Sequence, residues 1–391
     1  MAWVNTRLER LTGLRHSRRR HVVTVIAVIV LALLAPTVSY TRALLYPGHA
    51  GFAARSVEWI REHGGNGLVD AIETWRYTHD APPAAGPPAD AAFGHSPSSN
   101  QLPSPTRLSV RHHRRLGPAA VSPLSTLPPI PGEGIWRSIA TAPSAGATLF
   151  TSWFRPDAAH APVTVAAAFF PRGTDRFTLV SGTREPVPGL SSPRGHAVPA
   201  DATGALVATF NSGFKTRDSQ GGWYANGKAA VPLVAGAASI VIDDKGQVNV
   251  GAWGRDVSMT PHVTAVRQNL PLIVDHASPV AGLDNNVGRR FGSLKSQFEY
   301  TWRSGAGVDA QGNVIYVAGQ HLTLVTLAHA MSQAGIQRGL ELDIHPHMVS
   351  FNIEQHTAAG VRPAHLLTSM DEPANRYLAA DQRDFFYVTA H

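Results

Sequence analysis

The stretch Trp302–Asn352 constrains the fold of this chain more than any other part of its sequence. The β-branched and aromatic run Val314–Val317 predicts a strand. Thr323 then has the residue type of a helix N-cap, apolar residues follow at helical spacing, and Gly335 stands where a C′ glycine would end the helix. Leu340–Asp343 alternates apolar and acidic residues, which predicts a second strand with one buried face.

A loop with two histidines follows that second strand. Functional groups are often carried by loops on a rigid scaffold, so Asp343 at the strand end is a candidate site residue. On an extended segment Asp343, His345 and His347 would face one side, which makes His345 and His347 candidate ligands of a divalent metal such as zinc. Pro346 interrupts a regular strand, and ordinary hydrogen-bonded loop histidines fit the pattern as well. No other cofactor is expected.

The segment Arg303–Asp309, the predicted helix and Leu342-Asp343 together resemble the C-terminal half of the phosphodiester glycosidase family. That family includes the N-acetylglucosamine-1-phosphodiester alpha-N-acetylglucosaminidase type of domain. Upstream, Phe210–Phe214 resembles the Asn-Gly-Gly-Phe-Phe segment of the family. The resemblance extends over roughly Val163–Val388. The chain departs from it at Ile344–Met348, where the family has a glycine- and serine-rich loop.

The resemblance implies three catalytic candidates. Arg303 would bind phosphate, because a guanidinium can hold two phosphate oxygens at once. Asp343 would act as the acid or would stabilise an oxocarbenium-like centre, and Asn211 would orient the sugar. From the sequence alone, Arg303 also fits a surface salt bridge, Asp343 a cap, and Asn211 a turn residue.

The same motifs supply four substrate-binding candidates. Arg267 and Asn269 belong to a segment that resembles one before an apolar strand in the family, although it also fits an ordinary polar strand end. Gly213 and Ser304 lie inside the motifs that carry Asn211 and Arg303.

The segment 131–391 is predicted to be a domain of the α+β class with a mixed, multi-stranded sheet. Many short runs of strand type accompany one clear helix. Ala205–Phe210 fits a central strand that is buried on both faces and delivers Asn211 at its end. Asn226-Gly227 and Asp243–Gly246 are turn signals of two hairpins.

The N-terminus predicts a membrane anchor. Residues 1–20 form a basic tail, and the apolar run Val22–Ala35 lies within a segment, 21–45, that is long enough to cross a bilayer. The basic flank places the tail in the cytoplasm and the remaining chain outside, as a single-pass protein of the cell membrane. A cleaved signal peptide is the alternative, since the most apolar part is short and Pro36 follows it.

Two further segments are predicted between the anchor and the domain: a short helical stalk at 46–80 and a spacer rich in Pro, Ala and Ser at 81–130. The 29 prolines indicate long unstructured parts. The absence of cysteine excludes a disulfide scaffold and any thiolate site. The net charge of +7 comes mainly from local basic runs, so we expect no nucleic-acid partner for an exported domain. The small number of lysines is typical of a GC-rich, actinobacterial type of source.

Three functions remain open at this point. The first is an envelope-anchored hydrolase of glycosyl phosphodiesters, with a sugar-phosphate-containing glycan or glycolipid as partner. The second is a non-catalytic glycan-binding or scaffolding protein on the same fold, which the His-Pro-His loop favours because proline cannot donate a backbone N–H to an anion. The third is a metal-dependent phosphoesterase that uses Asp343, His345 and His347.

Overall fold

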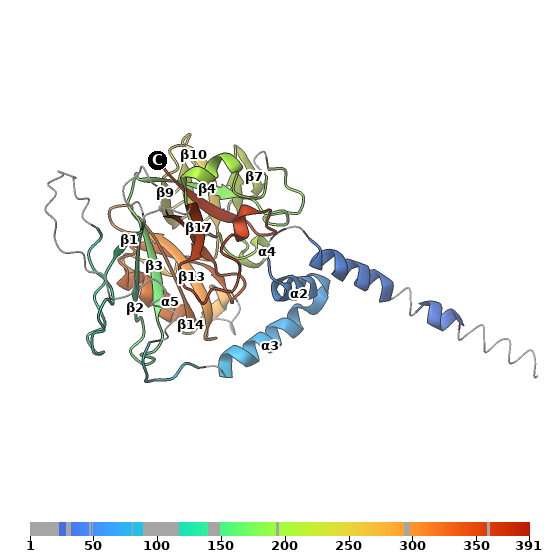
Figure 1. Cartoon of the computed structure of the whole chain (residues 1–391), viewed down its shortest axis with the longest axis horizontal. Helices are drawn as coiled ribbons and strands as arrows, with labels where there is room; N and C mark the ends of the chain where they lie inside the picture. Colours follow the sequence, from blue (N-terminus) through green and yellow to red (C-terminus); the bar gives the residue numbers. More distant parts are fainter. Residues whose placement is uncertain are drawn as a thin grey trace, which may run out of the picture. The chain divides into compact units, whose positions relative to one another are not determined.

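The computed structural model describes residues 23–28, 33–46, 48, 50–79, 81–88, 117–139, 149–192, 195–292, 298–357 and 360–391 (Figure 1). The chain divides into two compact units. The first comprises Met1–Pro47 and Gly51–Val69, and the second comprises Gly48–Ala50 and Asp70–His391.

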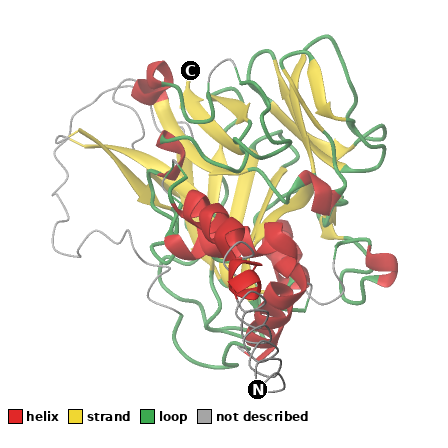
Figure 2. Cartoon of the chain, turned by 90° about the vertical axis from the view of Figure 1, so that its right-hand side faces the viewer, coloured by secondary structure: helices red, strands yellow, loops and turns green. Residues whose placement is uncertain are grey.

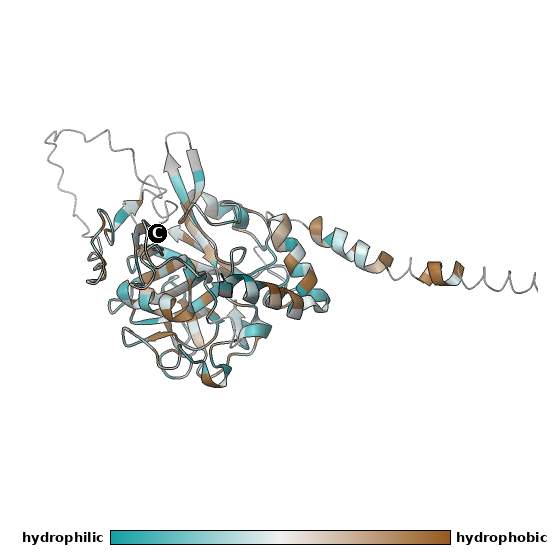
Figure 3. Cartoon of the chain, turned by 90° about the horizontal axis from the view of Figure 1, so that it is seen from below, coloured by the Kyte–Doolittle hydropathy of each residue, from teal (hydrophilic) through white to brown (hydrophobic). Residues whose placement is uncertain are grey.

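The first unit is helical where it is described. Its segment Val23–Leu44 is long and apolar enough to cross a membrane (Figure 3), a test that a signal sequence or a buried core helix also passes. Helix α2 (Phe52–Ile60) packs on the end of this segment: the rings of Tyr40 and Trp59 lie 5.0 Å apart, edge to face. The limits 21–45 and 46–80 given above stay predictions.

A kink separates α2 from helix α3 (Asn66–His79). Gly64 has a φ of +86°, in the left-handed region that glycine adopts without a Cβ penalty. The glycine-rich break expected from the sequence is therefore a turn between two helices. The last residues of α3, from Asp70 onward, belong to the second unit.

The second unit is built on three sheets (Figure 2). The largest has eight strands in the order β1-β2-β3-β14-β13-β15-β11-β12. Its members in chain order are β1 (Arg137–Ile139), β2 (Leu149–Phe154), β3 (Val165–Phe170), β11 (Val274–Asp275), β12 (Ser278–Pro279), β13 (Thr301–Val308), β14 (Val314–Leu322) and β15 (Arg338–Ile344).

The other two sheets have five strands each, in the orders β7-β6-β10-β8-β9 and β17-β16-β5-β18-β4. The first consists of β6 (Trp223–Ala225), β7 (Lys228–Val231), β8 (Ala238–Asp243), β9 (Val248–Ala252) and β10 (Val263–Gln268). The second consists of β4 (Asp175–Val180), β5 (Leu206–Asn211), β16 (Phe351–Thr357), β17 (Gly360–His365) and β18 (Phe385–Ala390).

The expectation of a mixed sheet was wrong. Every strand pair in these three sheets is antiparallel. The run Ala205–Phe210 is buried along its length as β5, but it lies between two antiparallel neighbours, β16 and β18. Burial on both faces explains the continuous apolar run, and it does not require parallel pairing. The structure confirms that the chain combines helices with sheets, and these sheets are antiparallel.

Helix α5 (Leu324–Gln333) packs on the largest sheet, beside β14 (Figure 1). Its N-cap is Thr323, whose Oγ1 accepts a hydrogen bond from Thr326 N at 3.2 Å, as the sequence predicted. The helix lies close to β13 because that strand carries glycines: a Cβ at Gly305 would come 2.4 Å from Met331 Sδ. Glycine in a strand marks such a close approach.

Aromatic packing joins the sheet of β5 to the largest sheet. The ring of Phe210 lies 5.6 Å from that of Phe351 and 5.4 Å from that of Tyr316 on β14. Phe386 stacks on the same ring of Phe210 at 5.2 Å. The ends of β5, β16 and β18 are therefore held against the strands that carry the candidate site.

Two β-bulges lie at one end of β13. Between Thr301 and Arg303, the partner strand β14 advances from Leu322 to Gly319 and so contains one residue more. Between Arg303 and Gly305, β15 advances from Ile344 to Glu341, again with an extra residue. A bulge changes the direction of the side chains beside it, so both bulges matter for the site.

The spacer predicted at 81–130 falls largely on residues 89–116, which lie outside the described residues. Its described parts, 81–88 and 117–130, contain no helix or strand. The two predicted hairpins are present as β6–β7 and β8–β9.

Candidate functional site

Three chain segments far apart in sequence meet at the end of β15. Asp343 is the residue before the last of β15, and Asn211 ends β5. Residue Phe385 of β18 pairs with Asn211, which places the preceding Arg383 and Asp384 beside the segment after β5. Ser212 Oγ donates a hydrogen bond to Asp384 O at 2.8 Å and fixes this arrangement.

Asp343 and Arg383 form an ion pair at this meeting point. Arg383 Nη2 lies 2.9 Å from Asp343 Oδ2 and also donates to Gly213 O at 2.8 Å. The side chains are 8% and 11% exposed, respectively, so the pair is largely buried yet keeps contact with solvent. Burial raises the pKa of Asp343 from 3.8 to about 6, against the opposing effects of Arg383 and of the hydrogen bond from Ile344 N.

Asn211 is linked to Asp343 through Ser304, and its amide is directed to the protein. Asn211 Nδ2 donates to Ser304 Oγ at 3.1 Å, and its Oδ1 accepts from Tyr316 OH at 3.1 Å and from Ser350 N at 3.2 Å. Ser304 Oγ in turn donates to Asp343 O at 3.2 Å. Asn211 and Ser304 therefore hold the end of β15 in place.

Gly213 and Asn269 also meet here. Gly213 has a φ of +152°, and a Cβ at this position would come 2.7 Å from Asn269 Nδ2. Asn269 Nδ2 donates to Leu342 O at 2.8 Å and to Glu341 O at 2.7 Å. Its Oδ1 is buried and has no hydrogen-bond partner, so one polar atom of this cluster is left without compensation.

Arg267 is buried behind the cluster and holds it from inside. It is 1% exposed, its Nε lies 2.7 Å from Asp384 Oδ2, and its Nη2 donates to Phe214 O. Arg267 thus joins the segment after β5 to the one before β18. This contact positions Arg383.

Arg303 has a different environment from the one predicted. Its Nη1 lies 2.7 Å from Glu341 Oε1, and its Nε donates to Leu322 O at 2.7 Å; the side chain is 1% exposed. Arg303 and Ser304 are neighbours in a strand and point to opposite faces, and Ser304 is the one that contacts Asp343 and Asn211. The alternative of a surface salt bridge does not describe Arg303 either, because its ion pair with Glu341 is buried.

The bulge in β15 explains why Glu341 and Asp343 have separate partners. Regular alternation would put the two carboxylates on one face. The extra residue opposite Arg303 and Gly305 breaks that alternation, so Glu341 contacts Arg303 and Asp343 contacts Arg383.

The two loop histidines have different neighbours. His345 has a φ of +76°, its Nε2 lies 3.4 Å from Glu73 Oε2 of α3, and its ring stacks on Tyr77 at 5.4 Å. His347 Nδ1 lies 3.2 Å from Glu372 Oε1, at ion-pair distance without hydrogen-bond alignment.

The carboxylate of Glu372 raises the pKa of His347. In the part of the chain that the structure describes, no three His, Asp or Glu side chains are placed to hold a metal ion. The structure thus does not bring Asp343, His345 and His347 together as a ligand set, and a metal at this loop stays a prediction.

The sequence analysis missed Arg383. Its only signal was the polar segment Asp381–Asp384, which contains three charged residues and Gln382, directly before the apolar strand Phe385–Ala390. It also missed Glu185, a carboxyl whose pKa is raised by burial and which interacts electrostatically with Arg383, Asp384 and Arg267.

Solved structures that are similar to this chain include the following two. The zebrafish N-acetylglucosamine-1-phosphodiester alpha-N-acetylglucosaminidase catalytic domain, auto-inhibited by its pro-peptide, has a TM-score of 0.40 and 12% identity over 66% of this chain and 87% of that one. A hypothetical protein from Synechocystis has a TM-score of 0.36 and 13% identity over 59% of each chain. No protein-family profile and no curated protein matches the sequence. At these TM-scores the likenesses indicate at most a distant relation of fold and carry no argument about activity.

Proposed function

We propose that this protein is a hydrolase of glycosyl phosphodiesters in envelope polysaccharide or glycolipid. Asp343 would donate a proton to the leaving phosphate oxygen, and Arg383, rather than Arg303, would bind the phosphate. The observation that carries the proposal is the partly exposed Asp343–Arg383 pair, in which burial raises the pKa of the carboxyl to about 6. A carboxyl with such a pKa is still partly protonated near neutral pH, as a general acid requires.

The charges of the pair support this assignment of roles. A phosphate that binds to Arg383 competes with Asp343 for the guanidinium, and its negative charge favours the protonated carboxyl. The bond between the anomeric carbon and the phosphate oxygen then breaks as that oxygen takes the Asp343 proton. Water adds to the anomeric carbon and loses a proton, which restores the acid. The products are the free sugar and a phosphomonoester.

The N-terminal segment supports an extracytoplasmic site for this reaction. The basic residues of 1–20 precede the apolar segment Val23–Leu44, and such a flank stays in the cytoplasm. The second unit would then face the envelope, where sugar phosphodiesters occur. Attachment to the membrane and the glycan partner are parts of this proposal.

A non-catalytic glycan-binding protein is the second candidate. It is favoured by the amide of Asn211 and the amide nitrogen of Asn269, which bond to the protein and so hold a rigid surface. A rigid, preformed site suits binding as well as catalysis.

One assay separates the candidates. The full chain, in detergent, is incubated with a chromogenic sugar phosphodiester, with and without a chelator. We expect Asp343→Asn to lower kcat by about 10²–10⁴-fold, whereas Asp284→Asn, a matched change at an exposed carboxylate, leaves it unchanged.

Saturable binding without turnover by the native chain would favour the second candidate. Loss of turnover on chelation and on His345→Ala would instead favour the metal-dependent phosphoesterase. Equal turnover of Asp343→Asn and the native chain would refute the role of Asp343.

A further inference from the structure

A surface cleft that we call the arginine cleft lies beside the candidate site. Its volume is about 680 Å³, which falls within the range of roughly 300–1,000 Å³ that is usual for ligand sites. Its lining comes from residues 218–220 and 234–237, from the segment directly after β10, and from a later loop that contains Arg289 and Arg290. All of these residues belong to the second unit.

The loop Gly282–Gly292 presents the two arginines on a firmly held backbone. Asn286 is fully buried inside it: its Oδ1 accepts a hydrogen bond from Phe291 N at 2.9 Å, and its Nδ2 donates to the carbonyl of the last loop residue at 3.2 Å. The side chains of Leu283 and Phe291 are buried in the hydrophobic core. The loop is therefore anchored near both ends and in its middle.

The backbone of this loop is also strained. Asn286 has a φ of +44° and Arg289 a φ of +55°, in the left-handed region that a residue with a Cβ rarely adopts. Strain of this kind persists only where the surrounding structure enforces it, and it collects at functional sites. Its position here, at one of the two arginines of the cleft, makes the loop a candidate binding element.

Both arginines are exposed, and their charges are not compensated. In the part of the chain that the structure describes, neither guanidinium has a carboxylate at ion-pair distance. The guanidinium of Arg290 lies 5.4 Å from the centre of the Phe291 ring, a contact that orients it and keeps its charge. One carboxylate also lines the cleft, but Asp218 Oδ1 already lies 3.6 Å from Arg217 Nε. The cleft thus offers positive charge to a ligand.

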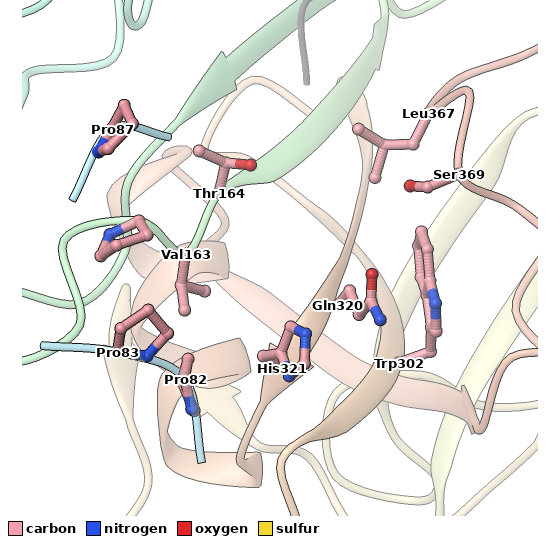
Figure 4. Close-up of a pocket in the computed structure, with 11 residues that line it drawn as sticks. Pro82, Pro83, Pro87, Val163, Thr164, Trp302, Gln320, His321, Leu367 and Ser369 are labelled. Atoms are coloured by element: carbon pink, nitrogen blue, oxygen red, sulfur yellow. The ribbon is translucent and has the colours of Figure 1, made fainter. Parts of the chain in front are cut away.

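The cavity at the start of β13 differs in this respect. Its walls include Trp302, His321, Pro82 and Pro83 (Figure 4). Among the described residues that line it there is no Asp, Glu, Lys or Arg, and Trp302 is only 3% exposed because it belongs to the core. An anion finds no cation there, so of these two hollows the arginine cleft is the one that suits a charged ligand.

We infer that the arginine cleft binds the phosphate group of a phosphorylated glycan. A guanidinium can donate two parallel hydrogen bonds to phosphate oxygens, so two adjacent arginines can hold one dianion. A loop that is already rigid loses little conformational freedom when it binds. The size of the cleft leaves room for the sugar that carries the phosphate.

The cleft is connected to the Asp343–Arg383 pair. Asn269 lines the cleft, and its Nδ2 donates to Leu342 O at 2.8 Å. Gly213, against which Asn269 packs, carries the carbonyl to which Arg383 donates. Under the proposed function, on which this assignment alone rests, the cleft holds one phosphate of a polymer while the pair acts on another. The binding itself requires no hydrolysis.

The test measures binding by isothermal titration calorimetry of the full chain in a zwitterionic detergent. The probe is glucose 6-phosphate, which has no glycosyl phosphate bond to break, and glucose is its neutral control. We expect saturable binding of the probe that weakens as salt is added, and no binding of glucose.

The double variant Arg289→Gln/Arg290→Gln should bind the probe about tenfold more weakly or worse, because it loses two charge-assisted contacts. The matched control, Arg137→Gln/Arg172→Gln, removes two exposed charges outside the cleft and should leave the dissociation constant unchanged. Unchanged binding in the first double variant would overturn the inference, as would the absence of saturable binding or equally tight binding of glucose.

Arg289→Gly separates a binding role from a structural one. Glycine adopts the left-handed conformation without strain, so this variant should fold and still bind the probe about threefold to tenfold more weakly. Arg383→Met should keep the binding at the cleft. Binding that persists in Arg383→Met, together with no turnover by the native chain, would refute the proposed hydrolase and leave this site standing. Binding lost in Arg383→Met alone would place the probe at the Asp343 site and overturn the inference.

A lipid headgroup would offer the same phosphate chemistry. Val287, in the same loop, is 79% exposed, and an apolar side chain beside arginines also fits a membrane surface. The titration is therefore repeated in nanodiscs of phosphatidylcholine with and without phosphatidylglycerol. Equal binding of glucose 6-phosphate in both supports a glycan phosphate. Binding that phosphatidylglycerol abolishes would assign the arginines to the lipid and overturn the inference.

Discussion

Two arginine–carboxylate pairs lie on either side of the bulge in β15 and differ in what they can do. Arg303 and Glu341 are 2.7 Å apart with side chains 1% and 4% exposed, and Arg303 also bonds to a carbonyl of β14. Arg383 and Asp343 are 2.9 Å apart with side chains 11% and 8% exposed. The residue types and the distances are nearly the same. The access of solvent is different.

This difference assigns the roles. Under the proposed function, a pair that is closed to solvent does not exchange its partner for a substrate, so Arg303 and Glu341 are assigned to the fold. A pair at the solvent boundary can exchange its partner. Burial raises the pKa of both Glu341 and Asp343, so the access of solvent, and not the pKa, separates the two pairs. Residue type in a motif is thus weaker evidence for a site than the environment of the side chain.

The largest expected effect on stability concerns the buried pair of Arg303 and Glu341. Arg303→Met should lower the free energy of unfolding by about 3–5 kcal/mol, because it leaves a buried carboxylate without its partner. Arg383→Met should lower it by less, since water reaches Asp343. Urea unfolding of both variants at pH 7 measures the two losses. Equal losses would remove the distinction between the pairs.

The pH dependence of stability gives the next largest effect. The pKa of Asp343 is raised in the folded state from 3.8 to about 6, so its contribution to stability is fully present below pH 3.8 and is lost as the pH rises through 6. Asp343→Asn lacks this loss. Its stability relative to the native chain should therefore increase by about 3 kcal/mol between pH 4 and pH 7. Unfolding curves across this range test it, with Asp284→Asn as the control that should show no trend.

Gly213→Ala should have a smaller effect on stability, and this effect should be confined to the surroundings of the Asp343–Arg383 pair. The added Cβ would come 2.7 Å from Asn269 Nδ2 at a φ of +152°, at a cost of about 1–3 kcal/mol. It would also displace the carbonyl to which Arg383 donates, so turnover should fall. Gly173→Ala is the matched control: Gly173 has a φ of +80° and open space around it. If both variants lost the same stability and kept full turnover, the contact at Gly213 would be irrelevant to the site.

The smallest expected effect is a shift in the pH profile of turnover. Arg383 lowers the pKa of Asp343, so Arg383→Met should move the alkaline limb of kcat to higher pH by about one unit. Arg217→Met, a change at an arginine that is 51% exposed, should not move it. An alkaline limb that stays in place in Arg383→Met would mean that another group donates the proton.

Much of the fold could be predicted from local patterns. Thr323 caps α5, and Asn226-Gly227 turns between β6 and β7, because caps and tight turns depend on a few adjacent residues. Strand β13 was not predicted as a strand. Its Gly305 and Gly307 weaken any strand signal. A Cβ at Gly305 would meet Met331 of α5 and one at Gly307 would meet Ile336 just after that helix, 26 and 29 residues later in the chain.

The candidate site could be predicted only in part. The sequence indicated Asp343, which the structure places beside Asn211 and Ser304. It indicated Arg303, which lies in the family-like segment, whereas the structure pairs Asp343 with Arg383. It gave no sign that a bulge would direct Asp343 away from Arg303. Arg383 stands 40 residues beyond Asp343 in a segment with no motif. No local pattern reports a contact of that separation.

The sequence by itself determined the elements and their chemical character: an apolar N-terminal segment, buried strands, one capped helix, and a carboxylate at the end of a strand. Those features depend on propensity and periodicity, which act between near neighbours. Only the tertiary structure decided which arginine meets Asp343, which pair is closed to water, and that Trp302 and His321 line a common cavity. Desolvation and partner choice depend on how distant strands pack, and in this chain two extra residues in two strands set that packing.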